Sequence, residues 1–162
     1  MVGQGLLARR GLEDADRRAS SAQVMERLLE WGVIPIVNEN DTVTSEEIRV
    51  GDNDTLSARV AALVQAGLLI LLSDVEGLYP ADPHQHPGLS PIPVVSPDDD
   101  LERFAGGPGS VGGTGGMVTK IAAARICADH GIPVVLACGE RPDVLRRIMA
   151  GEEIGTLFIR EG

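Results

Sequence analysis

A glycine-rich segment that leads into a predicted helix is the part of the sequence best suited to chemistry. It spans residues 112–120 and reads Gly-Gly-Thr-Gly-Gly-Met-Val-Thr-Lys. Glycines let the backbone approach a ligand and point successive N–H groups at it, and the N-terminus of the following helix adds free N–H groups and a positive dipole end. The pattern favours a polyphosphate site, although it lacks the spacing of a P-loop or of the dinucleotide fingerprint. A loop that merely caps a helix is the alternative.

Lys120, at the end of this segment, is the single lysine of the chain. The other 13 of the 14 basic residues are arginine. A compact ammonium and a planar guanidinium are not equivalent at a binding site, so one retained lysine indicates a position that needs the ammonium. Chance retention in an arginine-biased sequence is the competing explanation.

Three polar clusters follow or precede the predicted elements of a sheet. Residues 38–41 (Asn-Glu-Asn-Asp) end an apolar strand, 51–54 (Gly-Asp-Asn-Asp) begin a helix, and Ser73-Asp74 end another strand. One Asp or Asn suffices to cap a helix, so the additional side chains are free to hold an amine, orient a lysine or bind a ribose. Ligands of open α/β sheets bind at the carboxyl ends of the strands, where these clusters would meet. His84 and His86 belong to a loop, and we interpret them as solvated residues, with no metal site.

The elements that must position these residues alternate between strands and helices. Apolar periodicity predicts helices over 14–31, 53–66, 117–130 and 142–150, with a further short helix capped by Ser96. It predicts buried strands over 33–37, 68–72, 132–137 and 156–159, an excursion over 42–52 and a loop over 75–90. This alternation is typical of an α/β fold with a mainly parallel sheet.

Composition limits the class of protein. The chain has 162 residues, of which 43% are hydrophobic and 23% charged, as expected for one globular domain. A net charge of −10 argues against binding to nucleic acid or to an anionic membrane. Cys127 and Cys138 are interpreted as buried, reduced thiols. Since neither a membrane span nor a leader is evident, we expect a cytoplasmic protein.

Four motifs together resemble a known family. Residues 33–41, 50–54, 73–79 and 113–120 are similar, in order and spacing, to the glutamate 5-kinases, a branch of the amino acid kinase family. The resemblance implies a three-layer α/β/α sandwich with a mainly parallel sheet. It also implies transfer of the γ-phosphoryl group of ATP to the side-chain carboxylate of L-glutamate, the first step of proline biosynthesis, with Mg²⁺ on the phosphates.

The resemblance also implies roles for individual residues. Glutamate would be bound by Asp41 and Asn53, together with Asn38 and with Asp52 as support of the substrate loop. Lys120 would neutralise charge on the transferred phosphoryl group, and Asp54 would orient the catalytic lysines. ATP would be bound by Ser73, Asp74, Thr114, Gly115, Gly116, Met117, Val118, Thr119 and Lys120.

The sequence departs from the family pattern at one important point. Members begin with a strand that ends in a Lys-x-Gly-Ser-type turn, whereas Lys120 is the lone lysine here. We therefore expect the C-terminal part of a kinase domain, with a glutamate-site region at about 33–54 and a nucleotide-binding part at about 68–162 and without an RNA-modification-like domain. Such a chain would have weak or no activity, an exposed apolar sheet edge and a tendency to form homo-oligomers. The open alternatives are a family member with another acidic or nucleoside monophosphate substrate, a non-catalytic nucleotide-binding protein and a structural interaction domain.

Overall fold

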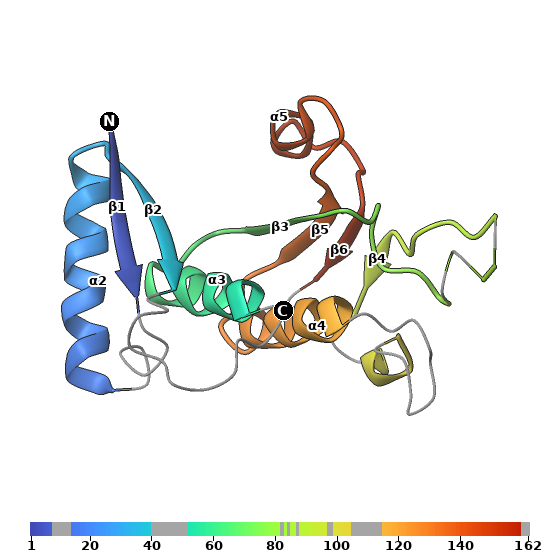
Figure 1. Cartoon of the computed structure of the whole chain (residues 1–162), viewed down its shortest axis with the longest axis horizontal. Helices are drawn as coiled ribbons and strands as arrows, with labels where there is room; N and C mark the ends of the chain where they lie inside the picture. Colours follow the sequence, from blue (N-terminus) through green and yellow to red (C-terminus); the bar gives the residue numbers. More distant parts are fainter. Residues whose placement is uncertain are drawn as a thin grey trace.

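A computed structural model describes residues 1–7, 14–39, 52–81, 83, 85–86, 88–96, 99–104 and 115–159, which form two sheets flanked by helices (Figure 1). The first sheet pairs β1 (Val2–Leu7) with β2 (Ile34–Glu39). The second has the order β3 (Leu69–Ser73), β5 (Val134–Cys138), β6 (Thr156–Phe158) and β4 (Val94–Val95). Within the described ranges every pair is parallel except β5 with β6, which confirms the mainly parallel sheet.

Helix α2 (Ala15–Glu30) covers one face of the smaller sheet. Its N-terminus is capped by Asp14, whose carboxylate accepts from the Arg17 N–H at 2.9 Å, and Gly32 follows it with a φ of +66°. A Cβ added to Gly3 would lie 3.5 Å from the Leu28 side chain, and one added to Gly5 would lie 3.5 Å from that of Met25. The two glycines of β1 therefore let α2 pack closely on the sheet.

Helices cover both faces of the larger sheet. Helix α3 (Asp52–Leu63) and helix α4 (Gly115–Ala128) lie side by side against one face, and α5 (Val144–Met149) lies on the other (Figure 1). The larger core joins small residues of α3 and α4 to Leu71 and Leu136 of the sheet, and the smaller core joins Val144 of α5 to Val135. All five residues of β5 are buried, as expected for a strand that is covered on both faces. This is the expected three-layer arrangement.

The structure corrects the sequence prediction in three places. Strands β1 and β4 were not predicted. Where a short helix was expected to follow Ser96, the Ser96 N–H donates to the Asp99 carboxylate at 2.7 Å and the Asp99 N–H donates to the Ser96 carbonyl, while residues 97–98 lie outside the described residues. A 3₁₀ helix begins later, over Leu101–Phe104. The other predicted elements lie within a few residues of their observed bounds, whereas the excursion over 42–51 lies outside the described residues.

Thr156 of β6 holds three segments together. Its fully buried hydroxyl accepts from the Leu78 N–H and donates to the Ile92 carbonyl, both at 2.7 Å. A Cβ added to Gly77 would lie only 2.6 Å from this oxygen. The loop that follows β3 is therefore fixed by backbone contacts that require a glycine and a hydroxyl.

Cys127 and Cys138 are free, buried thiols, as predicted. Burial raises the pKa of the Cys127 thiol to about 11. Of the helices within the described ranges, none combines the length and the apolar character that a membrane crossing requires.

Candidate active site

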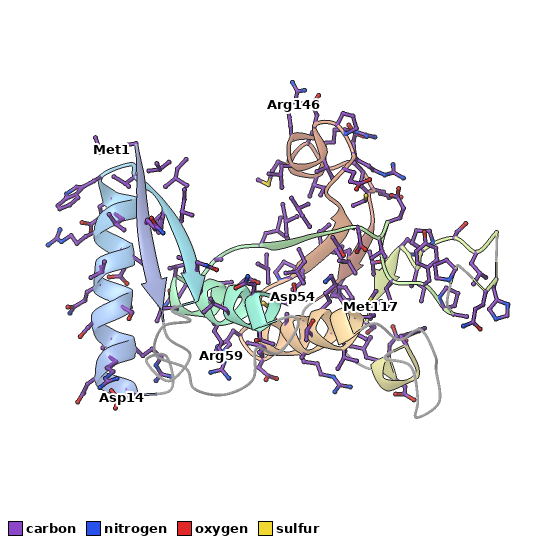
Figure 2. The ribbon with its side chains drawn as sticks, in the orientation of Figure 1. Met1, Asp14, Asp54, Arg59, Met117 and Arg146 are labelled. Carbon is purple, nitrogen blue, oxygen red and sulfur yellow. The ribbon has the colours of Figure 1, made fainter. Side chains whose placement is uncertain are left out.

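The described members of the predicted site lie at the ends of strands and at the starts of helices. Asn38 lies near the end of β2 and Ser73 ends β3, while α3 and α4 begin with residues 52 and 115. Each of these helices precedes a parallel strand, so its N-terminus returns to the carboxyl edge of the sheet. Figure 2 shows Asp54 and Met117 on the first turns of these adjacent helices.

Asp54 and Lys120 form an ion pair between the two helices. Lys120 Nζ lies 3.1 Å from Asp54 Oδ2, and the side chains are 13% and 19% exposed, respectively. The same carboxylate oxygen lies 2.7 Å from Thr119 Oγ1, which also lies 2.9 Å from the Gly116 carbonyl oxygen. The half-buried carboxylate therefore holds the hydroxyl and the ammonium at the start of α4, where an anionic ligand would meet both Nζ and the free N–H groups of the helix.

The residues of the glycine-rich motif that form the first turn of α4 have different environments. Gly115 and Gly116 are the first two helical residues, which leaves their N–H groups without acceptors from a preceding turn. The Met117 side chain packs against the larger core, and Val118 is 47% exposed. Of the residues predicted to bind ATP phosphates, Thr114 lies outside the described residues.

Asn38 and Asn53 line one cavity of about 480 Å³ between β2 and α3. Both side chains are exposed, and the cavity walls beside them are mostly apolar. The structure thus brings together two of the four predicted glutamate-binding residues. Asp52 is the first residue of α3, and Asp41 lies outside the described residues.

Ser73 and Asp74 lie where β3 ends. Ser73 Oγ donates to Asp74 Oδ1 at 2.9 Å, and Asp74 is an exposed residue. The neighbouring strand β5 ends at Cys138, whose thiol lies 3.9 Å from the Asp74 carbonyl oxygen. A pair of exposed oxygens at this edge suits the hydroxyl groups of a ribose.

Two features of this edge were missed in the sequence. Arg141, just beyond β5, donates from Nε to Glu76 at 2.5 Å and joins the loops that follow β3 and β5. The hydrogen bond and the charge of Glu76 raise the pKa of the Arg141 guanidinium. Ser57 Oγ donates to the Asp54 carbonyl at 2.7 Å and lines the cavity. The Arg141–Glu76 pair spans 65 residues, so no local pattern could reveal it.

The described residues contain no group of side chains that could together coordinate a metal ion. Among the residues that the structure describes, no three His, Cys, Asp or Glu side chains gather into a group that could hold an ion. Asp54, whose carboxylate contacts Thr119 and Lys120 of α4, already pairs with the Lys120 ammonium.

Comparisons with known proteins identify relatives of this chain. A glutamate 5-kinase from Symbiobacterium thermophilum is 87% identical over 162 residues, which are 100% of this chain and 62% of that protein. A glutamate 5-kinase from Caldanaerobacter subterraneus subsp. tengcongensis is 50% identical over 98% of this chain and 43% of its own length. The structure of a UMP kinase from Bacillus anthracis covers 99% of this chain at a TM-score of 0.66 and 15% identity, and the match spans 59% of that kinase.

The chain thus spans less than two thirds of the length of each of these proteins. The low identity to the UMP kinase supports a shared fold alone. The model of the amino acid kinase family matches residues 1–138, which is most of the chain. From this match and from the fold, we conclude that the chain belongs to the amino acid kinase family.

Proposed function

We propose that the chain is the nucleotide-binding and partial glutamate-binding portion of an ATP-dependent glutamate 5-kinase. The reaction would transfer the γ-phosphoryl group of ATP to the side-chain carboxylate of L-glutamate and yield L-glutamyl 5-phosphate, the first step of proline biosynthesis. The observation that carries the proposal is the Asp54–Lys120 pair at the glycine-rich start of α4. The high identity to a glutamate 5-kinase supports the choice of substrate.

The residues of the site would act mainly by positioning and charge neutralisation, as phosphoryl transfer requires. The substrate carboxylate is itself the nucleophile, so no protein nucleophile is needed. Lys120 would neutralise charge that develops on the transferred group and on ADP, while Asp54 and Thr119 fix its position. N–H groups at the start of α4, with Thr114 in the preceding loop, would bind phosphate oxygens.

The acceptor would bind at the opposite side of Asp54. Asn38 and Asn53, which share a cavity, would donate amide hydrogens to glutamate, and Asp41 and Asp52 would bind its ammonium group and support the loop. Ser73 and Asp74 would bind the nucleoside. Mg²⁺ fits this site as an ion coordinated chiefly by phosphate oxygens and water, since it keeps several waters and needs few protein ligands.

We infer a glutamate-site region at about 33–54, a nucleotide-binding part at about 68–162 and a cytoplasmic homo-oligomer. The acidic composition supports the expectation that membranes and nucleic acids are not its partners.

ATP binding to the 162-residue chain tests the role of Lys120 directly. We expect Lys120→Ala to weaken ATP binding in calorimetry at least tenfold, about 1.4 kcal/mol, with Lys120→Arg intermediate because a guanidinium is a poor substitute for a point charge. Arg146→Ala is the matched control, since Arg146 is 76% exposed on the distant helix α5. Equal affinity for ATP in Lys120→Ala and in the unaltered chain would contradict the proposal.

The acceptor is tested without requiring turnover. In amide NMR spectra recorded with ATP and Mg²⁺ present, L-glutamate should shift the resonances of Asn38 and Asn53, and L-aspartate should shift them much less. Trapping of acyl phosphate with hydroxylamine then measures whatever transfer occurs, and we expect it to be slow. Shifts caused equally by aspartate, or caused by UMP in place of glutamate, would refute glutamate as the substrate.

A further inference from the structure

The segments that follow β3 and β5 lie against each other beyond the ends of the two strands. β3 and β5 run side by side (Figure 1) and pair in parallel, with Ser73 opposite Cys138 as their last pair. Past this pair, the Gly139 N–H donates to the Ser73 carbonyl at 2.8 Å, and the Cys138 thiol lies 3.9 Å from the Asp74 carbonyl oxygen. A Cβ added to Gly139 would lie 3.3 Å from Leu72 Cβ, so a glycine suits this close approach. The backbone of Asp74 is therefore packed against the end of β5.

The loop after β3 is held at three points. Gly139 fixes its first residue, and Thr156 fixes its far end, where the Thr156 hydroxyl accepts from the Leu78 N–H at 2.7 Å. Between these points, the Glu76 carboxylate accepts from Arg141 Nε at 2.5 Å. Arg141 thus ties the middle of this loop to the segment after β5.

Arg141 is itself anchored in a tight turn. Its N–H donates to the Cys138 carbonyl at 3.4 Å, and its carbonyl accepts from the N–H of Val144, the first residue of α5, at 3.3 Å. The guanidinium therefore extends from a backbone that both β5 and α5 fix. An arginine presents its donors in a rigid planar fork, so this anchoring defines where the Glu76 carboxylate lies.

The ion pair is too exposed to serve mainly as a source of stability. The Arg141 and Glu76 side chains are 44% and 38% exposed, and water screens pairs of this kind so that they contribute little to folding. Their effect on position is different, because the loop that the pair holds begins with Ser73 and Asp74. A ligand bound by these two side chains responds to displacements of the loop far smaller than those that unfold it.

We propose that Arg141 is a positioning residue for the nucleoside of ATP, which acts through Glu76 on the loop that carries Ser73 and Asp74. This inference rests on the proposed function, in which those two residues bind the nucleoside. The phosphates belong to another element, the start of α4 with Lys120. The loss of Arg141 therefore weakens recognition of the nucleoside and leaves binding of the phosphates unchanged.

Calorimetry with two ligands, ATP and inorganic tripolyphosphate, each with Mg²⁺, separates these effects because tripolyphosphate has no nucleoside. We expect Arg141→Ala to weaken binding of ATP by about fivefold and to leave binding of tripolyphosphate within about twofold, which also shows that the variant is folded. Lys120→Ala should weaken binding of both ligands. Arg147→Ala is the matched control, since Arg147 is 38% exposed in an ion pair with Glu152 on the same β5–β6 connection, and it should change neither affinity. Equal weakening of the two ligands by Arg141→Ala would overturn the proposal.

Variants of Glu76 test whether Arg141 acts through this carboxylate. Glu76→Ala should weaken ATP binding as much as Arg141→Ala does, and the double variant should lose no more than either, because both changes break one interaction. The exchanged pair, Glu76→Arg with Arg141→Glu, should bind ATP more tightly than either of these two changes alone. Losses that add in the double alanine variant would show that the two residues act separately and would overturn the proposal.

The outcomes also separate this inference from the proposed function. ATP binding that Lys120→Ala weakens and Arg141→Ala leaves unchanged would overturn the positioning role and leave the proposed function in place. Absence of binding of both ATP and tripolyphosphate to the unaltered chain would overturn the two proposals together.

Discussion

Replacement of Thr156 by valine should destabilise the protein through two backbone groups at once. The Thr156 hydroxyl accepts from the Leu78 N–H and donates to the Ile92 carbonyl, both at 2.7 Å, and the side chain is fully buried. Valine keeps the shape but removes both hydrogen bonds. A buried group left without a partner costs roughly 1–3 kcal/mol. Since partial relaxation admits water to one of the two groups, we expect the free energy of unfolding to fall by about 2–4 kcal/mol.

The assay is urea unfolding followed by circular dichroism, with Thr156→Ser as the control that keeps the hydroxyl and loses a methyl group. Thr156→Ser should cost roughly 1 kcal/mol, chiefly from the small cavity. If Thr156→Val were as stable as Thr156→Ser, the hydroxyl would not be what fixes the loop after β3, and the reasoning would be refuted. A large loss in both variants would instead assign the effect to packing.

Three further predictions concern single residues. Gly155 has a φ of +77° and an added Cβ would clash with the Leu136 carbonyl oxygen, so Gly155→Ala should lower the unfolding free energy by about 2 kcal/mol or more in urea melts, and Gly151→Ala, at positive φ but in open space, should cost less. Burial raises the pKa of the Cys127 thiol from 9.0 to about 11. The stability that the neutral thiol contributes is therefore complete below pH 9 and is lost as the pH rises to 11, by about 3 kcal/mol in total. The difference in unfolding free energy between the wild type and Cys127→Ala should change by about half of this between pH 8 and pH 10, and a difference that does not change with pH would contradict the prediction. Asp54→Asn should lower stability by roughly 1–3 kcal/mol in the same melts while Asp143→Asn, whose partner is 76% exposed, should have almost no effect.

Local sequence signals predicted most of the helices and the long buried strands well. The Asp14 cap and Gly32 mark both ends of α2, and the glycine-rich run locates the start of α4. Strand β1 was not predicted because Gly3 and Gly5 have no preference for strands. Their close fit against Met25 and Leu28 is a tertiary contact, which a local sequence pattern does not show. The two-residue strand β4 is defined by its partner β6 rather than by its own sequence.

The sequence predicted candidate residues of the site but not the contacts between them. Motif positions placed Asp54 and Lys120 at the starts of two helices, and the structure adds that they touch. The role of Thr119 as a second donor to Asp54 spans 65 residues and could not be read from the sequence. The roles of the individual residues in catalysis remain predictions that the binding and turnover experiments above address.

The position of β6 between β5 and β4 has a consequence for the order of folding. β5 and β6 are joined through the short helix α5, so their antiparallel pairing closes a small loop at low entropic cost. β4 precedes β6 by some sixty residues along the chain and pairs with β6 alone among the described strands. It therefore has no docking surface until β6 is in place, and its long-range pairing forms late. The loop that Thr156 fixes after β3 depends on the same strand β6, so this loop and β4 should be the last parts of the larger sheet to become ordered and the first to open.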